Sequence, residues 1–233
     1  MKYQKRLSAP QHYPIKRKDN KYIIGGKGAH KTSDSIPLVV ILRDLLEIVE
    51  NKKEAKKALH EGKVLVDGRK VRDVSLKVGF MDNISIPDSD LHYRVSKDKE
   101  GIAVIEISEK ESEKKLCKIE DKKILKGGKV QLELHDGSNI VVEEDEYPTK
   151  STIVLKVPEK EVQKSLEFKK GQLALISGGK HSGQLAKIKK VREREGSQPD
   201  MIALENDGEF ETVRPYVFVV GEKKPEVTVN AEN

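Results

Sequence analysis

The pattern of apolar residues predicts a buried helix in the first third of the chain. Residues 38–42 are all Leu, Val or Ile, and four more apolar side chains follow by residue 49. Pro37 precedes this run, and proline is compatible with the first turn of a helix. We therefore expect a mostly buried helix from residue 37 to about residue 49.

The next segment predicts a second helix followed by a β-hairpin. Asn51 and Glu54 have the spacing of a capping box that opens the helix, and Gly62 is placed to end it. The pair Asp67-Gly68 then lies between two short alternating runs, which is a strong signal of a two-residue hairpin turn. We expect these elements to form one small helix-helix-hairpin domain over residues 37–90.

The middle of the chain, residues 91–165, is patterned as short β-strands. Such runs lie at 102–107, 130–134 and 139–142, and glycine-containing pairs mark turns between them. We expect a central antiparallel β domain here. Its role is either to space the flanking modules or to contact a protein neighbour.

The C-terminal part predicts a small β-barrel followed by a tail. Between residues 166 and 221, two alternating strands are joined by a glycine-rich loop, and further strands are expected near 201–204 and 210–220. Residues 222–233 are expected to form a disordered tail. The predicted fold class is therefore α+β and multi-domain.

Positive charge is concentrated in residues 1–36, where nine lysines and arginines face two aspartates. The whole chain carries only +6, so the rest of it is close to neutral. With few apolar residues, this segment is predicted to be a basic extended arm that orders on a polyanion. Its prolines and glycines argue against a membrane-binding amphipathic helix. A solvated tail without a ligand is the competing interpretation.

Rings interleave with the charges of the arm, and exposed aromatic rings stack on bases in RNA sites. We expect nucleic acid as the partner, with His12 and Tyr13 as the stacking candidates. The candidate RNA ligands of the arm are Lys2, Lys5, Arg6, His12, Tyr13, Lys16, Arg17, Lys18, Lys21, Lys27, His30 and Lys31.

A second group of cations lies on the second predicted helix and on the hairpin. Like charges spaced i, i+4 on a helix repel mildly, so such a face is better suited to lie opposite an anion. An ordinary solvated lysine-rich helix is the alternative for the helix taken alone. The candidate RNA ligands here are Lys52, Lys53, Lys56, Lys57, Lys63, Arg69, Lys70 and Arg72.

Two runs carry a specific resemblance. Residues 54–71 and 78–84 resemble the RNA-binding domain named after bacterial small-subunit ribosomal protein four. Residues 5–15, 36–38 and 42–44 resemble the archaeal and eukaryotic small-subunit ribosomal protein four, the e-type, a different protein family. Tyr13 stands where that family has Trp. The resemblance implies RNA binding and a central family-specific domain.

Residues 168–191, which comprise two predicted strands and the glycine-rich loop between them, resemble the KOW motif of ribosomal proteins and transcription elongation factors. The motif implies a C-terminal SH3-like β-barrel that uses its loop to contact RNA. Glycine allows the backbone to approach a phosphate closely. A plain hairpin turn is the alternative. The candidate RNA ligands are Gly179, Lys180, His181, Lys187 and Lys189.

Several classes of function are disfavoured by what the sequence contains. Cys117 is the single cysteine, which excludes an intrachain disulfide and zinc sites built from several thiolates. No apolar run reaches the roughly 18 residues of a membrane span, and no signal peptide is recognisable. The histidines are scattered without a catalytic constellation. We expect a cytoplasmic protein without metal, cofactor, enzymatic activity or small-molecule substrate.

These observations together predict a structural constituent of the small ribosomal subunit that binds small-subunit ribosomal RNA and adjoins neighbouring ribosomal proteins. The alternative is a KOW-type transcription elongation factor or RNA chaperone that binds RNA transiently. A free-standing regulator of translation is a third possibility.

Overall fold

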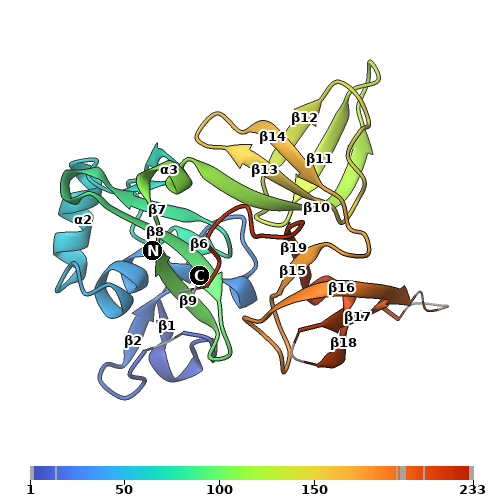
Figure 1. Ribbon diagram of the computed structural model, residues 1–233. Helices are drawn as coiled ribbons and strands as arrows, with labels where there is room; N and C mark the ends of the chain where they lie inside the picture. Colours follow the sequence, from blue (N-terminus) through green and yellow to red (C-terminus); the bar gives the residue numbers. More distant parts are fainter. Residues whose placement is uncertain (1–2, 14, 193, 195–197, 207, 231–233) are drawn as a thin grey trace. The chain divides into compact units, whose positions relative to one another are not determined.

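A computed structural model describes residues 3–13, 15–192, 194, 198–206 and 208–230, and divides the chain into two compact units (Figure 1). The first unit comprises residues 1–96 and 100–115, and the second comprises 97–99 and 116–233. Both are built mainly from antiparallel β-sheets.

The first unit contains one five-stranded sheet, in the order β5-β4-β7-β8-β9, and two strand pairs, β1-β2 and β3-β6. Its elements are β1 (Tyr3–Lys5), β2 (Tyr22–Ile24), β3 (Ser35–Pro37), α1 (Leu38–Val40), α2 (Lys52–His60), β4 (Leu65–Val66), β5 (Arg69–Lys70), β6 (Lys77–Gly79), β7 (Asn83–Ile86), β8 (Leu91–Lys97), β9 (Ile102–Glu106) and α3 (Glu109–Ser112).

The first predicted helix is shorter and less regular than expected. After α1, residues Ile41–Leu45 form a π-helical turn, closed by a 2.9 Å hydrogen bond from the Leu46 N–H to the Ile41 carbonyl. The backbone at Glu47 then turns to φ 52° and ends the helical segment. The apolar residues 38–42 are nevertheless fully buried, as their continuous pattern predicts.

Helix α2 follows the prediction closely. The Asn51 side chain accepts hydrogen bonds from the N–H groups of Lys53 and Glu54 at 2.9 and 3.1 Å. The Glu54 carboxylate accepts from the N–H of Glu50, at 2.8 Å, so the reciprocal bond of the cap reaches one residue further than expected. These bonds satisfy amide groups that have no partner within the helix.

The end of α2 and the hairpin that follows are also as predicted. The N–H groups of Gly62 and Lys63 donate to the carbonyls of Leu59 and Ala58, both at 3.1 Å, which is the Schellman pattern of a helix end. Strands β4 and β5 then pair across Asp67 and Gly68, whose φ angles of 49° and 73° are those of a type I′ turn.

The N-terminal segment is not the disordered, extended arm that its composition predicts. Strand β1 pairs with β2, and Tyr13, Ile23 and Ile24 are 3, 3 and 6% exposed within the same core as Leu38. The Arg17 guanidinium donates to the carbonyls of residues 9 and 10, both at 2.7 Å. A few apolar side chains are enough to anchor the N-terminal segment, because they pack into a core that is built mainly by the rest of the first unit.

The second unit contains two five-stranded antiparallel sheets, β12-β11-β10-β13-β14 and β18-β17-β16-β15-β19. Its elements are β10 (Lys114–Ile124), which begins in the last residues of the first unit, β11 (Val130–Leu134), β12 (Asn139–Val142), β13 (Thr152–Lys156), β14 (Glu161–Leu166), β15 (Leu173–Ile176), β16 (Leu185–Arg192), β17 (Met201–Glu205), β18 (Glu209–Val213) and β19 (Val217–Gly221).

The predicted central domain is divided between the two units. The strand expected at 102–107 is β9, which adjoins β8 in the first unit. The strands expected at 130–134 and 139–142 are β11 and β12 of the second unit, around a core that includes Cys117, Leu132 and Ile153. The division near residue 115 falls within one continuous strand, where no turn signal marks it.

The described part of the C-terminal tail, residues 222–230, is ordered and packed, which corrects the prediction of a disordered tail. Val227 and Val229 are 2 and 0% exposed, and the Glu226 N–H donates to the Val220 carbonyl at 2.9 Å. The alternation of Val227 and Val229 with polar residues is the signal that identifies this packing.

We expect Tyr13→Ala to lower the free energy of unfolding by about 3–5 kcal/mol, because it removes a large aromatic side chain from a filled core. Tyr22→Ala is the matched control, since Tyr22 is 54% exposed on the neighbouring strand β2, and should cost under about 1 kcal/mol. Urea unfolding of both variants measures the difference. Equal losses would show that the N-terminal segment is not part of the core.

Candidate nucleic-acid interface

Helix α2 presents a basic stripe, which we define as Lys53, Lys56, Lys57 and His60. These positions follow the spacing i, i+3, i+4, i+7, so they share one face of the helix. All four are exposed and together line a shallow hollow. The opposite face carries the fully buried Ala55 and Leu59. The cations therefore face solvent because the apolar side of the same helix is buried.

Lys52 lies outside the basic stripe. Its ammonium donates a 2.8 Å hydrogen bond to the hydroxyl of Tyr3 on β1. Its side chain is only partly exposed. Lys52 thus connects α2 to the N-terminal strand pair, a contact that no local pattern in the sequence indicates.

The hairpin lies next to the end of α2, and its cations are exposed. A Cβ atom added at Gly62 would lie 3.1 Å from the Lys70 Cδ, so the Lys70 side chain passes over the helix end. Arg69 and Arg72 are exposed beside it. Lys63 pairs with Glu61 at 2.9 Å, and this contact lowers the pKa of the Glu61 carboxylate. The negative charge of Glu61 offsets the positive charge of Lys63.

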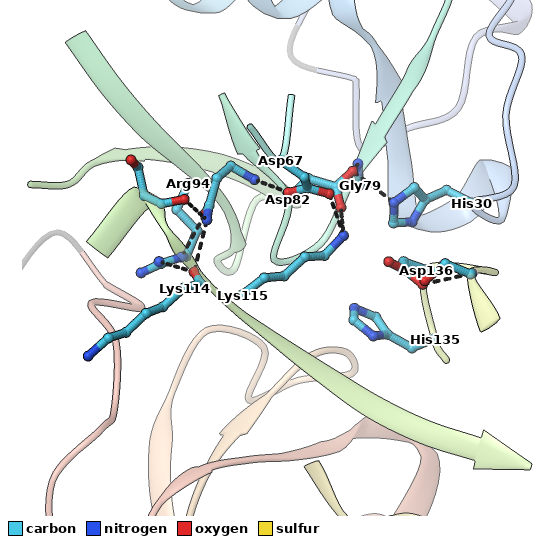
Figure 2. A network of polar contacts seen from close by, with 12 residues as sticks. His30, Asp67, Gly79, Asp82, Arg94, Lys114, Lys115, His135 and Asp136 are labelled. Carbon is cyan, nitrogen blue, oxygen red and sulfur yellow. Dashed lines mark hydrogen bonds and ion pairs between the residues drawn. The ribbon is translucent and has the colours of Figure 1, made fainter. Parts of the chain in front are cut away.

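The hairpin is held in place by a buried ionic network (Figure 2). The Lys115 ammonium lies 2.7 Å from a carboxylate oxygen of Asp67, the turn residue, and 2.7 Å from one of Asp82. Asp82 also accepts from the Gly79 N–H at 2.8 Å and lies 2.8 Å from the His30 ring. Residues from four separate segments thus meet around one buried carboxylate, that of Asp82, and one partly buried carboxylate, that of Asp67.

The two carboxylates respond differently to this environment. Burial disfavours the charged form of Asp82, but the Lys115 ammonium and the hydrogen bond from His30 outweigh it and lower the pKa of Asp82 to about 2. For Asp67, burial is the larger effect, and its pKa is raised although Lys115 acts in the opposite direction. The neighbouring negative charge of Asp82 adds to this rise.

A second buried cation, Arg94, lies beside this network. Its guanidinium donates to the carbonyls of Glu111 and Lys114 at 2.8 and 3.0 Å and to the side chain of Asn83 at 3.1 Å. Burial lowers the pKa of Arg94 to about 10, which leaves it charged at neutral pH. Arg94 therefore stabilises the junction of β7, α3 and β10 and is not presented to a ligand.

Four predicted RNA ligands of the arm have structural roles instead. Arg6 is 5% exposed and donates to the Lys16 carbonyl at 2.6 Å. The guanidinium of Arg17 binds two backbone carbonyls, and the His30 ring adjoins Asp82. Tyr13 is buried, which raises its pKa to about 12. Their side chains were predicted to face RNA because composition alone does not distinguish interior cations and rings from exposed ones.

The other arm candidates remain at the surface, apart from His12 and Lys2. His12 is half-buried, with its ring in an edge-to-face contact with Tyr13 at 4.9 Å. Lys2 lies outside the described residues. The exposed cations of the segment are Lys5, Lys16, Lys18, Lys21, Lys27 and Lys31.

In the second unit, the glycine-rich loop joins β15 to β16. Gly179 has φ 82°, and the Lys180 side chain is exposed. His181 is half-buried and stacks on Phe210 with 4.1 Å between ring centres, so it holds the loop against β18. On β16, Lys187 and Lys189 are exposed on either side of the buried Ile188, as the alternation predicts.

Contacts from distant segments of the second unit fix this loop, and sequence reasoning did not identify them. The Ser177 N–H donates to the Tyr216 carbonyl at 2.8 Å, and a Cβ added at Gly178 would lie 2.9 Å from the Tyr216 ring. The Asn230 amide donates to the Gly183 carbonyl at 3.0 Å. The loop that carries Lys180 is thus supported from both ends.

Within the described ranges, no group of three or more His, Cys, Asp or Glu side chains is arranged to hold a metal ion. Among the same residues, no helix is both long enough and apolar enough to cross a membrane.

Helix α2, which presents the basic stripe, and the hairpin after it lie within a segment that matches a known domain. Residues 36–84 match the S4 domain, and residues 89–162 match the ribosomal family S4e. The chain therefore contains an S4 domain followed by a family-specific segment, in the order that the resemblance implies.

Relatives match along nearly the full length. The chain is 46% identical over 232 residues to the small ribosomal subunit protein eS4 of Methanocaldococcus jannaschii, covering 95% of this chain and 94% of that protein. It is 41% identical over 226 residues to eS4 of Methanocella arvoryzae, covering 96 and 95%. The chain belongs to the S4e family of ribosomal proteins.

A solved structure agrees with this assignment. The crystal structure of the 30S ribosomal protein S4e from Thermoplasma acidophilum superposes with a TM-score of 0.71 at 29% identity. The match covers 81% of this chain and 96% of that one.

We expect Lys115→Met to lower the free energy of unfolding at pH 7 by about 3–5 kcal/mol, because it leaves the buried Asp82 and the partly buried Asp67 without their cation. Lys114→Met, at the exposed neighbouring position, should change it by less than about 0.5 kcal/mol. Urea unfolding compares the two variants. A Lys115→Met protein as stable as Lys114→Met would contradict the assigned role of the network.

The pH dependence of the free energy of unfolding supplies a second test of the ionic network. The pKa of Asp82 falls from its ordinary 3.8 to about 2 on folding, so its stabilisation is complete above about pH 5 and is lost as pH falls toward 2. The difference in free energy of unfolding between wild type and Lys115→Met should therefore become smaller in acid, because protonated carboxyl groups carry no charge for the ammonium to neutralise. A difference that stays constant down to pH 3 would contradict this assignment.

Proposed function

We propose that this protein is a structural constituent of the small ribosomal subunit that binds small-subunit ribosomal RNA and supports subunit assembly and translation. Membership of the S4e family supports the class. The observation that carries the RNA-binding surface is the basic stripe of α2, four exposed residues on one face beside the exposed cations of the hairpin. A phosphate backbone is the ligand that such a face suits best.

We propose three contact regions on the protein. The first is the basic stripe with Lys63, Arg69, Lys70 and Arg72. The second comprises the exposed lysines of the N-terminal segment. The third is the glycine-rich loop with Lys180 and the strand positions Lys187 and Lys189, within a sheet that we interpret as a KOW SH3-like barrel. Neighbouring ribosomal proteins are the other partners proposed, in the cytoplasmic ribosome.

No enzymatic step is part of this function. The cationic side chains contact phosphates, and phosphate contacts fix position and orientation without chemistry. Most of the binding energy then comes from release of counterions, with a slope of log affinity against log salt near −0.7 to −0.9 per phosphate neutralised.

We expect the triple variant Lys53→Glu, Lys56→Glu, Lys57→Glu to fold normally, since these side chains are exposed and avoid the buried face of α2. Its affinity for purified small-subunit ribosomal RNA should fall at least about tenfold, and its salt slope should flatten by about 2–3, because up to three phosphate contacts are lost. Filter binding between 50 and 200 mM salt measures both quantities.

The matched control is Lys110→Glu, Lys123→Glu, Lys126→Glu, which makes the same change of net charge at exposed positions that belong to none of the three proposed regions. If the two triple variants lost affinity equally, binding would depend on net charge and not on the basic stripe. Lys52 is left unchanged in this test because its ammonium is bonded to Tyr3.

Permanent incorporation is tested separately from RNA affinity. We expect the endogenous protein to sediment with small ribosomal subunits after a high-salt wash, as a structural constituent does. Release of all of the protein by the wash would instead support a transiently bound RNA factor.

A further inference from the structure

We propose that strands β1 and β2 form a second kind of RNA site, in which Tyr3 and Tyr22 stack on unpaired bases. This inference rests on the proposed function, since it specifies which part of the RNA one surface recognises. The two rings are called the tyrosine pair below.

The register of the strands places the tyrosine pair on one face. Tyr3 lies opposite Ile24, and Lys5 lies opposite Tyr22. Opposite residues of an antiparallel pair share a face, as do residues two apart on one strand. Tyr3 and Tyr22 are therefore diagonal neighbours on one face, which they share with Lys5 and Ile24.

Both rings are exposed to an unusual extent for large aromatic side chains. Tyr3 is 56% and Tyr22 is 54% exposed, whereas Ile23, on the other face of the ribbon, is 3% exposed and Ile24, which shares the face of the two tyrosines, is 6% exposed. The strand pair is anchored in the core by these two isoleucines, so the two rings are presented on a fixed support. A support of this kind keeps the entropic cost of binding low.

Cations accompany each ring. The Lys52 ammonium is 2.8 Å from the Tyr3 hydroxyl and 5.0 Å from its ring centre, which places it at the hydroxyl edge of the ring. The Lys21 ammonium lies 5.4 Å from the centre of the Tyr22 ring. Aromatic rings that stack on bases, with ammonium groups that track the backbone, are the two components of single-strand recognition.

The position of Lys52 joins this surface to the RNA contact proposed above. Lys52 is the first residue of α2, the helix that carries the basic stripe, and it is bonded to the tyrosine pair. A strand whose phosphates lie along α2 can therefore continue onto β1 and β2. This continuity, with the surrounding positive charge, favours a single-stranded RNA segment over a protein as the occupant.

The test compares two probes of equal charge: an oligoadenylate of about ten nucleotides and the abasic ribose-phosphate strand of the same length. Fluorescence anisotropy measures their affinities for the full chain. We expect the wild-type protein to prefer oligoadenylate. Tyr3→Leu and Tyr22→Leu should each weaken oligoadenylate binding by about tenfold, because base–aromatic stacking is lost. Binding of the abasic strand and the salt slope should not change.

Tyr3→Phe and Tyr22→Phe are the matched controls, since each keeps the ring and removes the hydroxyl. We expect the Phe variants to retain the preference for oligoadenylate. Equal affinity of the wild type for both probes, or Leu variants that keep the preference, would overturn the stacking site and leave the rings as a protein contact.

Failure of the wider function would look different. In that case the abasic strand would bind without salt dependence, or the triple glutamate variant of α2 would bind it as well as the wild type does. The two failures are therefore separable in the same assay.

Discussion

The ammonium of Lys115 lies 2.7 Å from the carboxylates of the partly buried Asp67 and the buried Asp82, and the geometry of the first unit depends on it. Two buried carboxylates near one another repel, and each loses its hydration on folding. The shared cation offsets both costs and draws together the hairpin turn at Asp67, the loop at Asp82 and the imidazole of His30. The exposed cations of the hairpin are thus positioned from inside the protein.

Interior and surface cations differ in chemistry as well as in place. Arg6, Arg17 and Arg94 direct their guanidinium groups at backbone carbonyls, which several fixed donors can satisfy together. The basic stripe consists of three lysines and a histidine, whose polar groups are stabilised either by water or by a bound anion. The net charge of the N-terminal segment therefore overestimates the number of its cations that are available to RNA. Some of these cations instead hold the fold together.

Sequence reasoning succeeded where the determinants are local. The cap at Asn51, the helix end at Gly62 and the turn at Asp67-Gly68 depend on residues within a few positions of one another. It failed where partners are distant: Tyr13 is buried in a core that its basic surroundings in the sequence do not indicate, and Lys115 bonds to Asp67 across 48 positions. The candidate site followed the same division, since the stripe of α2 was recognisable while the roles of Arg17 and His30 were not.

The ionic network also affects whether the S4 domain of this chain can be excised or transferred to another protein. The matched domain ends at residue 84, but the cation that neutralises its two interior carboxylates is residue 115, and the imidazole beside Asp82 is residue 30. A fragment cut at the boundaries of the match would keep both acids and lose both of their basic partners. A graft or minimal fragment that keeps the ionic network therefore has to extend beyond the matched domain on both sides, to include residue 30 and residue 115.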